Sequence, residues 1–203
     1  MIRLAAALVL AWAAAAEATQ DAWPALYDVA GVAEDDVLNV RAAPDAAAPI
    51  VATLTHDAAG IEVIRPGPRH DWGLVNTGEG IGWVSLAYMA RRPGQWAGAV
   101  PEVAQCFGTE PFWSLLQEAG TLRLDRPGAD GTPLPITWQG GTLAHRGRYA
   151  LTAGDGATGL AVTLAVADCG DGMSDRAYGI EATVIVDGTD GPDMVWGCCS
   201  LAR

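Results

Sequence analysis

The chain contains no lysine: all twelve of its basic residues are arginines, set against 24 aspartates and glutamates. The formal net charge at pH 7 is therefore −12. A surface this acidic repels phosphate backbones and anionic lipid headgroups. We therefore expect neither a nucleic acid nor a membrane surface among the partners of this protein.

Long hydrophobic runs are also missing, apart from one near the N-terminus. Residues 4–16 are thirteen apolar residues that follow Arg3, whereas a membrane-spanning helix needs about 20. A basic start, a short apolar run and small residues at Ala16 and Ala18 are typical of a signal peptide. We predict cleavage after residue 18, with a competing site after residue 16, and a periplasmic or secreted mature protein. No cysteine follows either site, so no lipid anchor is expected.

Cysteine is scarce, with only Cys106, Cys169, Cys198 and Cys199. Their spacing is not the C-x-x-C spacing of zinc sites, and cysteines of exported proteins form disulfides. Neighbouring residues on a strand face opposite sides, so Cys198 and Cys199 do not easily share one partner. We predict two disulfides, which join Cys106 and Cys169 to this adjacent pair in either order. A strained bond between Cys198 and Cys199 is the alternative.

Residues 26–90 contain short apolar segments at close intervals, separated by glycine and proline. The segments are 26–29, 37–40, 50–54, 61–64, 72–75 and 82–85. The alternation of polar and apolar residues at 37–41 is typical of a half-buried strand, and glycines 78 and 80 favour a hairpin. We predict a small β-barrel over residues 26–90, followed by a linker at 91–101 that contains Pro93 and Pro101.

The same stretch resembles a bacterial SH3-like domain. The resemblance is carried by V-L-N-V-R-A-A-P at 37–44, I-V-A-T-L at 50–54, W-G-L-V at 72–75 and G-W-V-S at 82–85. The family commonly has a serine and a glycine before the proline, where this chain has Ala42 and Ala43. The resemblance implies an exported barrel that often binds cell-wall peptidoglycan or its stem peptides.

Trp72, Trp83 and Tyr88 are the aromatic candidates for a binding groove in this barrel, because aromatic side chains offer large contact area at low entropic cost. In the alternative interpretation, Trp72 and Trp83 fill the barrel core and Tyr88 caps it. The sequence favours the second interpretation.

Residues 102–203 contain further strand-like segments joined by glycine-rich turns. We predict strands at 112–117, 121–126, 134–138, 142–152, 159–167, 180–186 and 194–201. Seven or eight antiparallel strands joined by short turns favour an up-and-down barrel, closed or partly open. The polar stretch 169–178 is predicted to be a loop with a helical turn that crosses one end of this barrel. The predicted fold class is therefore all-β, with a disulfide-bonded second barrel.

This second part resembles a family of uncharacterised bacterial envelope proteins. The matching motifs are G-T-E-P-F-W at 108–113, C-G-D-G-M-S at 169–174 and G-C-C at 197–199. More loosely, its layout is similar to the lipocalin-like META and lysozyme-inhibitor barrels. The resemblance implies a fold and a location in the cell envelope, and it implies no activity.

Two roles are open for the polar residues of these motifs. Glu110 precedes a proline and is confined to extended geometry, and Arg176 is a suitable bidentate partner for its carboxylate. Such a pair would lock the 169–178 loop, and this structural role is the favoured one. In the alternative, Glu110, Asp171, Asp175 and Arg176 line the mouth of a polar pocket.

Catalytic and metal-binding patterns are weak. Ser174, His145 and a nearby aspartate would make a triad, but Ser174 is not followed by the glycines of a nucleophile elbow. Two disulfides leave no free thiol for a cysteine hydrolase. Asp187, Asp190 and Asp193 do not have the spacing of an EF-hand. We expect a protein that is not an enzyme and that has no metal or cofactor.

The looser resemblance suggests a second function, inhibition of a cationic lysozyme. Lysozyme inhibitors present a Ser-Gly-x-x-Tyr segment to the lysozyme cleft, and the nearest stretch here is S-D-R-A-Y at 174–178, without the glycine. The acidic surface would attract such a partner.

The sequence thus predicts an exported envelope binding protein. Its first barrel is expected to contact peptidoglycan or a wall-derived peptide, and its second to bind an unknown small molecule or protein. Inhibition of lysozyme-like cell-wall hydrolases is the alternative. The candidate ligand-binding residues are Trp72, Trp83, Tyr88, Glu110, Trp113, Ser174, Arg176 and Tyr178.

Overall fold

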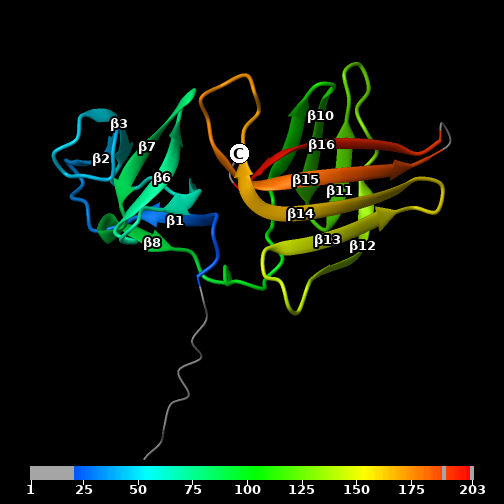
Figure 1. Ribbon diagram of the computed structural model, residues 1–203, viewed down its shortest axis with the longest axis horizontal. Coiled ribbons are helices and arrows are strands. Elements are labelled where there is room, and N and C mark those ends of the chain that lie inside the picture. The colour runs from blue at the N-terminus through cyan, green and yellow to red at the C-terminus, as the bar shows by residue number, and fades with distance from the viewer. Residues whose placement is uncertain (1–20, 189–190, 202–203) are drawn as a thin grey trace, which may run out of the picture.

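The computed structural model describes residues 21–188 and 191–201. The predicted signal peptide and Asp190 lie outside these residues. The described chain forms two β-structures side by side, with the C-terminal barrel to the right of the N-terminal sheets in Figure 1. No helix within the described ranges is long and apolar enough to cross a membrane.

The N-terminal module, defined as residues 25–91, consists of two sheets. One has the strand order β4-β1-β8 and the other the order β3-β2-β7-β6-β5. The module also contains one 3₁₀ turn, η1, after β7. The elements are β1 (Ala25–Val29), β2 (Val37–Arg41), β3 (Ile50–Thr55), β4 (Ile61–Val63), β5 (Arg65–Pro66), β6 (Trp72–Thr77), β7 (Gly80–Ser85), η1 (Leu86–Tyr88) and β8 (Met89–Arg91).

Small and aliphatic side chains fill the core of this module. Alternate residues of β1 are buried, and Tyr27 is the largest of them. Val40, Val63, Val75 and Val84 complete the centre from the neighbouring strands. The prediction that Trp72 and Trp83 fill this core is wrong, since both lie outside the buried cluster and are half-buried.

Two glycines explain why the tryptophans face away from the core. Gly73 and Gly82 point inward, where a Cβ atom would lie 2.5 Å from methyl groups of Val63 and Val40. Successive strand residues face opposite sides, so the residues next to these glycines point outward. Trp72 and Trp83 are those residues.

The connecting segment, residues 92–104, leads to a closed barrel of antiparallel strands. The strand order is β10-β11-β12-β13-β14-β15-β16-β9. Each strand pairs with the next one along the chain, and β9 closes the barrel by pairing with β16. This confirms the predicted up-and-down barrel. The strands are β9 (Gln105–Thr109), β10 (Phe112–Glu118), β11 (Thr121–Asp125), β12 (Leu134–Gly141), β13 (Arg148–Gly154), β14 (Gly159–Cys169), β15 (Tyr178–Asp187) and β16 (Asp193–Ser200).

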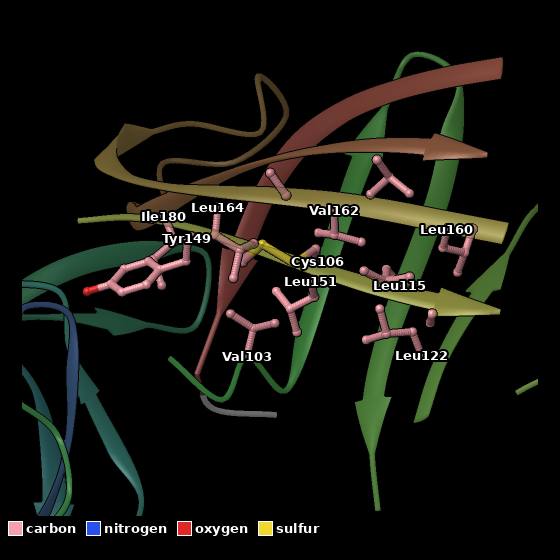
Figure 2. Packing of buried hydrophobic residues seen from close by; sticks show 14 of the residues in the cluster. Val103, Cys106, Leu115, Leu122, Tyr149, Leu151, Leu160, Val162, Leu164 and Ile180 are labelled. Atoms are coloured by element: carbon pink, nitrogen blue, oxygen red, sulfur yellow. A yellow bond between two sulfur atoms is a disulfide. The ribbon is translucent and has the colours of Figure 1, made fainter. Parts of the chain in front are cut away.

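Inward-facing aliphatic residues fill the barrel at alternate positions. Leu115, Leu151, Val162 and Leu164 are at most 1% exposed, and they meet in the interior with Cys106 (Figure 2). The two-residue period that predicted the strands therefore also fixed which side chains lie inside.

Both disulfides tie the C-terminal strand to the rest of the barrel. Cys106 of β9 pairs with Cys199, and Cys169 at the end of β14 pairs with Cys198. The prediction that the adjacent cysteines take separate partners is confirmed, and the structure settles the order. Disulfides of this kind are typical of proteins in oxidising compartments.

Three local predictions are wrong. Residues 105–109 form a strand, whereas the sequence predicts that the first strand of the barrel begins at residue 112. Residues 142–147 form a turn rather than the start of a strand that begins at Arg148. Residues 170–177 form bends without the predicted helical turn.

Candidate functional site

One face of the five-stranded sheet carries a row of five side chains. Directly paired residues share a face of a sheet. The pairs Ile50–Arg41, Arg41–Trp83, Trp83–Leu74 and Leu74–Arg65 therefore place Ile50, Arg41, Trp83, Leu74 and Arg65 in one row across the sheet. This outer row lies opposite the core, with Trp83 between Arg41 and Leu74 and with Arg65 beyond Leu74.

The arginines of the outer row have little competition from carboxylates. The guanidinium carbon of Arg65 lies 5.4 Å from the centroid of the Trp83 ring, which is a cation–π distance. Arg41 donates a hydrogen bond from Nη1 to the carbonyl oxygen of Ala48 at 2.7 Å. Neither arginine is in an ion pair with a described residue. The outer row is therefore a local positive site on a protein of net charge −12.

The barrel lies against the face of β6 that carries Leu74. Asn76 lies on the same face of β6 as Leu74, and it is hydrogen-bonded to Ala177 in the β14–β15 loop. Leu74 and Ile64 are buried, although neither belongs to the core of the module or to the core of the barrel. Gly179 of β15 lies against the carbonyl oxygen of Ile64. Figure 1 shows this loop, coloured orange, leaning toward β6 and β7.

Tyr88 is not part of the outer row. It is 46% exposed in the η1 turn, where its ring faces Gly31. No ring stacking among the described residues joins it to Trp72 or Trp83. Trp72 lies two residues before Leu74 on the same face of β6. The Cβ atom of Trp72 and the ring of Trp83 both lie against Gly67. The structure thus brings the two tryptophans together and leaves the tyrosine apart.

The G-x-E-P-F-W and G-C-C motifs form a packed layer at one end of the barrel. A Cβ atom at Gly197 would overlap the carbonyl of Phe107, and one at Gly108 would overlap the Trp113 ring. Trp113 is 4% exposed and donates from Nε1 to the carbonyl oxygen of Trp196 at 3.2 Å. The glycines are needed for this close approach, and Trp113 is packed inside this layer.

Asp171 organises the loop between β14 and β15. Its carboxylate accepts hydrogen bonds from the amides of Met173 and Ser174 at 2.9 Å each and from the Ser174 hydroxyl at 2.8 Å. Thr109 donates to the Asp171 carbonyl oxygen at 3.0 Å, which joins the loop to β9. Partial burial raises the pKa of the Asp171 carboxyl, but these hydrogen bonds and the nearby Arg176 outweigh it and lower that pKa.

The predicted ion pair between Glu110 and Arg176 is wrong. Glu110 is exposed in the turn between β9 and β10, before a cis-proline. Arg176 is exposed and places its guanidinium carbon 5.5 Å from the centroid of the Tyr178 ring. Asp171 and its hydrogen bonds stabilise the loop in place of that pair.

A depression of about 650 Å³ lies between the motifs. Three exposed apolar side chains surround it: Phe112 is 56% exposed, Met173 71% and Trp196 54%. Glu110 and Asp171 also line it, so the alternative interpretation of a polar mouth is partly met. Asp175 and Arg176 are not among its lining residues.

The segment 174–178, the candidate for lysozyme inhibition, exposes only some of its side chains to solvent. Tyr178 is 2% exposed and packs edge-on against Phe107, with ring centroids 5.0 Å apart. Burial raises the pKa of its hydroxyl, which therefore stays neutral at physiological pH. The Ser174 hydroxyl is bound to Asp171. Neither side chain is free to enter a partner's cleft.

The other chemical candidates do not assemble. His145 is exposed in the 142–147 turn, and no described contact joins it to Ser174. Within the described ranges, no group of three or more histidine, cysteine, aspartate or glutamate side chains is arranged to hold a metal ion. Asp193 is bonded to Arg126 at 2.6 Å.

Sequence reasoning missed the arginines of the outer row and the apolar rim of the depression. The sequence pattern identifies Arg41 only as part of an alternating strand, and it indicates no role for Arg65. A signal was present, because arginines near tryptophan-containing strands stand out in so acidic a chain. The strand pairing that places them beside Trp83 is not readable from the sequence.

Comparison of the chain with protein-family models, curated proteins and solved structures finds no match. The outer row and the depression therefore have to be interpreted from their own chemistry.

Proposed function

We propose that this protein is an exported binding protein of the cell envelope, and that its N-terminal module is SH3-like and contacts peptidoglycan or a wall-derived peptide. The observation that carries the proposal is the placement of Trp83 in one row with Arg41 and Arg65, on the face of the sheet opposite the module's core. Wall peptides carry free carboxylates, and arginine binds carboxylates through paired hydrogen bonds.

The charge distribution supports an anionic ligand at this place. The net negative charge of the chain repels anions. The arginines of the outer row have no carboxylate partner among the described residues, so an anionic ligand is attracted to them. Trp83 adds a flat apolar surface for the backbone or a sugar ring of the ligand. The ligand would bind along the sheet and end near the β14–β15 loop, which Asn76 holds in place.

The barrel has a supporting role in this proposal, and the depression between its motifs is a second binding surface for an unknown ligand. Its exposed Phe112, Met173 and Trp196 favour an apolar group. Lysozyme inhibition has less support, since Tyr178 is buried and Ser174 is engaged within its own loop.

Co-sedimentation of the mature chain with purified peptidoglycan tests the proposal. We expect the wild type to pellet with the polymer, and we expect Trp83→Ala to weaken binding by about 30-fold, the effect of removing a central aromatic contact of about 2 kcal/mol. Arg65→Gln should weaken binding as well without disturbing a half-buried ring. Trp138→Ala is the matched control, because Trp138 is 55% exposed on the barrel, away from the outer row.

Failure of the wild type to pellet would contradict the proposal. Equal pelleting of the wild type, Trp83→Ala and Arg65→Gln would contradict the assignment of the site. Circular dichroism of each variant shows whether a loss of binding comes from a loss of structure.

A further inference from the structure

A cavity of about 380 Å³ lies where the N-terminal module, the connecting segment and the barrel meet. Ligand sites of small molecules have volumes of about 300–1,000 Å³ and occur preferentially between domains. All three parts of the chain contribute apolar walls to this cavity. They include Trp23, Leu26, Trp96, Val100, Ile180 and Tyr149.

Hydrogen bonds hold the walls in place. The Gln95 side chain accepts from the Leu26 amide at 2.6 Å and donates to the carbonyl oxygens of Leu26 and Arg92 at 2.9 Å each. At the barrel side, the Ala104 amide donates to the carbonyl oxygen of Ser200 at 2.9 Å. The connecting segment is thus attached to both neighbours, and a ligand would enter a preformed space.

Tyr149 brings an unused polar group to this cavity. Its residue is only 7% exposed, and its hydroxyl makes no hydrogen bond with any residue that the structure describes. Figure 2 shows the ring extending from the barrel core toward the N-terminal module, with its oxygen at the far end. The hydroxyl oxygen remains accessible, so it can donate to or accept a hydrogen bond from a molecule in the cavity.

Neither charged residue that lines the cavity is available to pair with an anionic ligand. Arg92 is engaged by Asp28 at 2.8 Å, and Glu102 is exposed at the rim. The surrounding surface is acidic overall. Both Gln95 Nε2 hydrogens and one acceptor site of Oε1 are used by the backbone. The Tyr149 hydroxyl is therefore the main group that selects a ligand.

We propose that this cavity binds a neutral, largely apolar ring compound that carries one carbonyl or hydroxyl oxygen, with that oxygen on the Tyr149 hydroxyl. The site is separate from the outer row and does not depend on wall binding. It requires both β-structures, because neither supplies all of the walls.

Titration of the full mature chain with Nile red, a neutral ring dye that carries a carbonyl, tests this site. We expect saturable binding with one dye per chain and a blue-shifted emission. Ala99→Trp, in the connecting segment, and Val166→Trp, on β14, each place a large ring in the cavity wall and should abolish this binding. Ala129→Trp, in an exposed hairpin loop, is the matched control and should bind the dye as the wild type does.

Tyr149→Phe keeps the ring and removes only the hydroxyl. We expect a dissociation constant roughly 2 to 10 times higher, which is the range for one neutral hydrogen bond. An unchanged constant would overturn the role of Tyr149. The site itself would be overturned by a wild type that does not bind the dye saturably, or by filled variants that bind it as well as the control.

Discussion

Asn76 and Ala177 are joined by two hydrogen bonds across the two halves of the protein. The Ala177 amide donates to Asn76 Oδ1 at 3.0 Å, and Asn76 Nδ2 donates to the Ala177 carbonyl oxygen at 2.9 Å. One amide side chain thus satisfies both backbone groups of a residue 101 positions later. Ser200 and Glu62 add a hydrogen bond across the same boundary. The two Asn76 bonds hold the β14–β15 loop against the outer face of β6, together with the Asp175 amide, which donates to the carbonyl oxygen of Glu79 at 3.0 Å.

We expect Asn76→Ala to release this loop. Two backbone groups lose their partner, and each lost hydrogen bond is worth about 0.5–1.5 kcal/mol. Hydrogen exchange at residues 170–177 should become faster by roughly 5- to 100-fold. Asn39→Ala, a half-buried asparagine on β2, is the control and should leave this exchange unchanged. Unchanged exchange in Asn76→Ala would show that the loop is held by other contacts.

Gly197→Ala should strongly destabilise the barrel. The added Cβ would overlap the carbonyl of Phe107 and crowd the Trp113 ring, and neither backbone is free to move in a closed barrel. We expect a loss of about 3 kcal/mol or more in the free energy of unfolding, measured by urea denaturation. Gly170→Ala is the matched control in the neighbouring loop, because its Cβ would meet nothing within 4 Å. Equal stability of both variants would mean that the close packing of this layer is not needed.

Reduction should unfold the barrel and spare the N-terminal module. Chain-entropy estimates give ~4.6 kcal/mol for the bond between Cys106 and Cys199 and ~3.6 kcal/mol for that between Cys169 and Cys198, in line with sequence separations of 93 and 29. We expect one thermal transition to fall in reductant while another stays unchanged. Replacing the first pair by serine should cost more stability than replacing the second. Identical melting with and without reductant would contradict this picture.

The order of the β14–β15 loop should depend on the ionisation of Asp171. Hydrogen bonds lower the pKa of this carboxyl in the folded protein, so its contribution is present above the ordinary pKa of 3.8 and is lost as pH falls through the lower folded value. We expect the NMR shifts of the Met173 and Ser174 amides to titrate together with a midpoint below 3.8. In Asp171→Asn this titration should vanish. A midpoint at or above 3.8 would show that the carboxylate is not held as described.

The barrel was largely predictable from the sequence because its strands bury one face each. Leu160, Val162 and Leu164 alternate with polar or small residues, and that pattern fixes both the strand and its inner face. The disulfide partners followed from the adjacency of Cys198 and Cys199. Their order did not, because it depends on which of the two faces the interior, and β16 is buried on both sides near its end.

The site was harder to predict because it depends on strand pairing. Trp72 and Trp83 each stand next to a glycine and near valines, so either face of β6 or β7 would have suited a core. The close approach at Gly73 and Gly82 decides the matter, and it involves residues of other strands. The contact between Asn76 and Ala177 joins residues far apart in the chain, and the sequence pattern did not reveal it.

Isothermal titration with a soluble wall peptide is the most direct test of the proposed function. The full mature chain would be titrated with the free peptide and with the same peptide amidated at its carboxyl groups. We predict measurable binding of the free peptide, no binding of the amidated one, and binding about tenfold weaker or worse in Arg65→Gln, since a hydrogen bond to a charged group is worth about 1.5–3 kcal/mol. Arg69→Gln, an exposed arginine paired with Asp71, should bind normally. Equal affinity of the wild type and Arg65→Gln, or of the two peptides, would contradict the account.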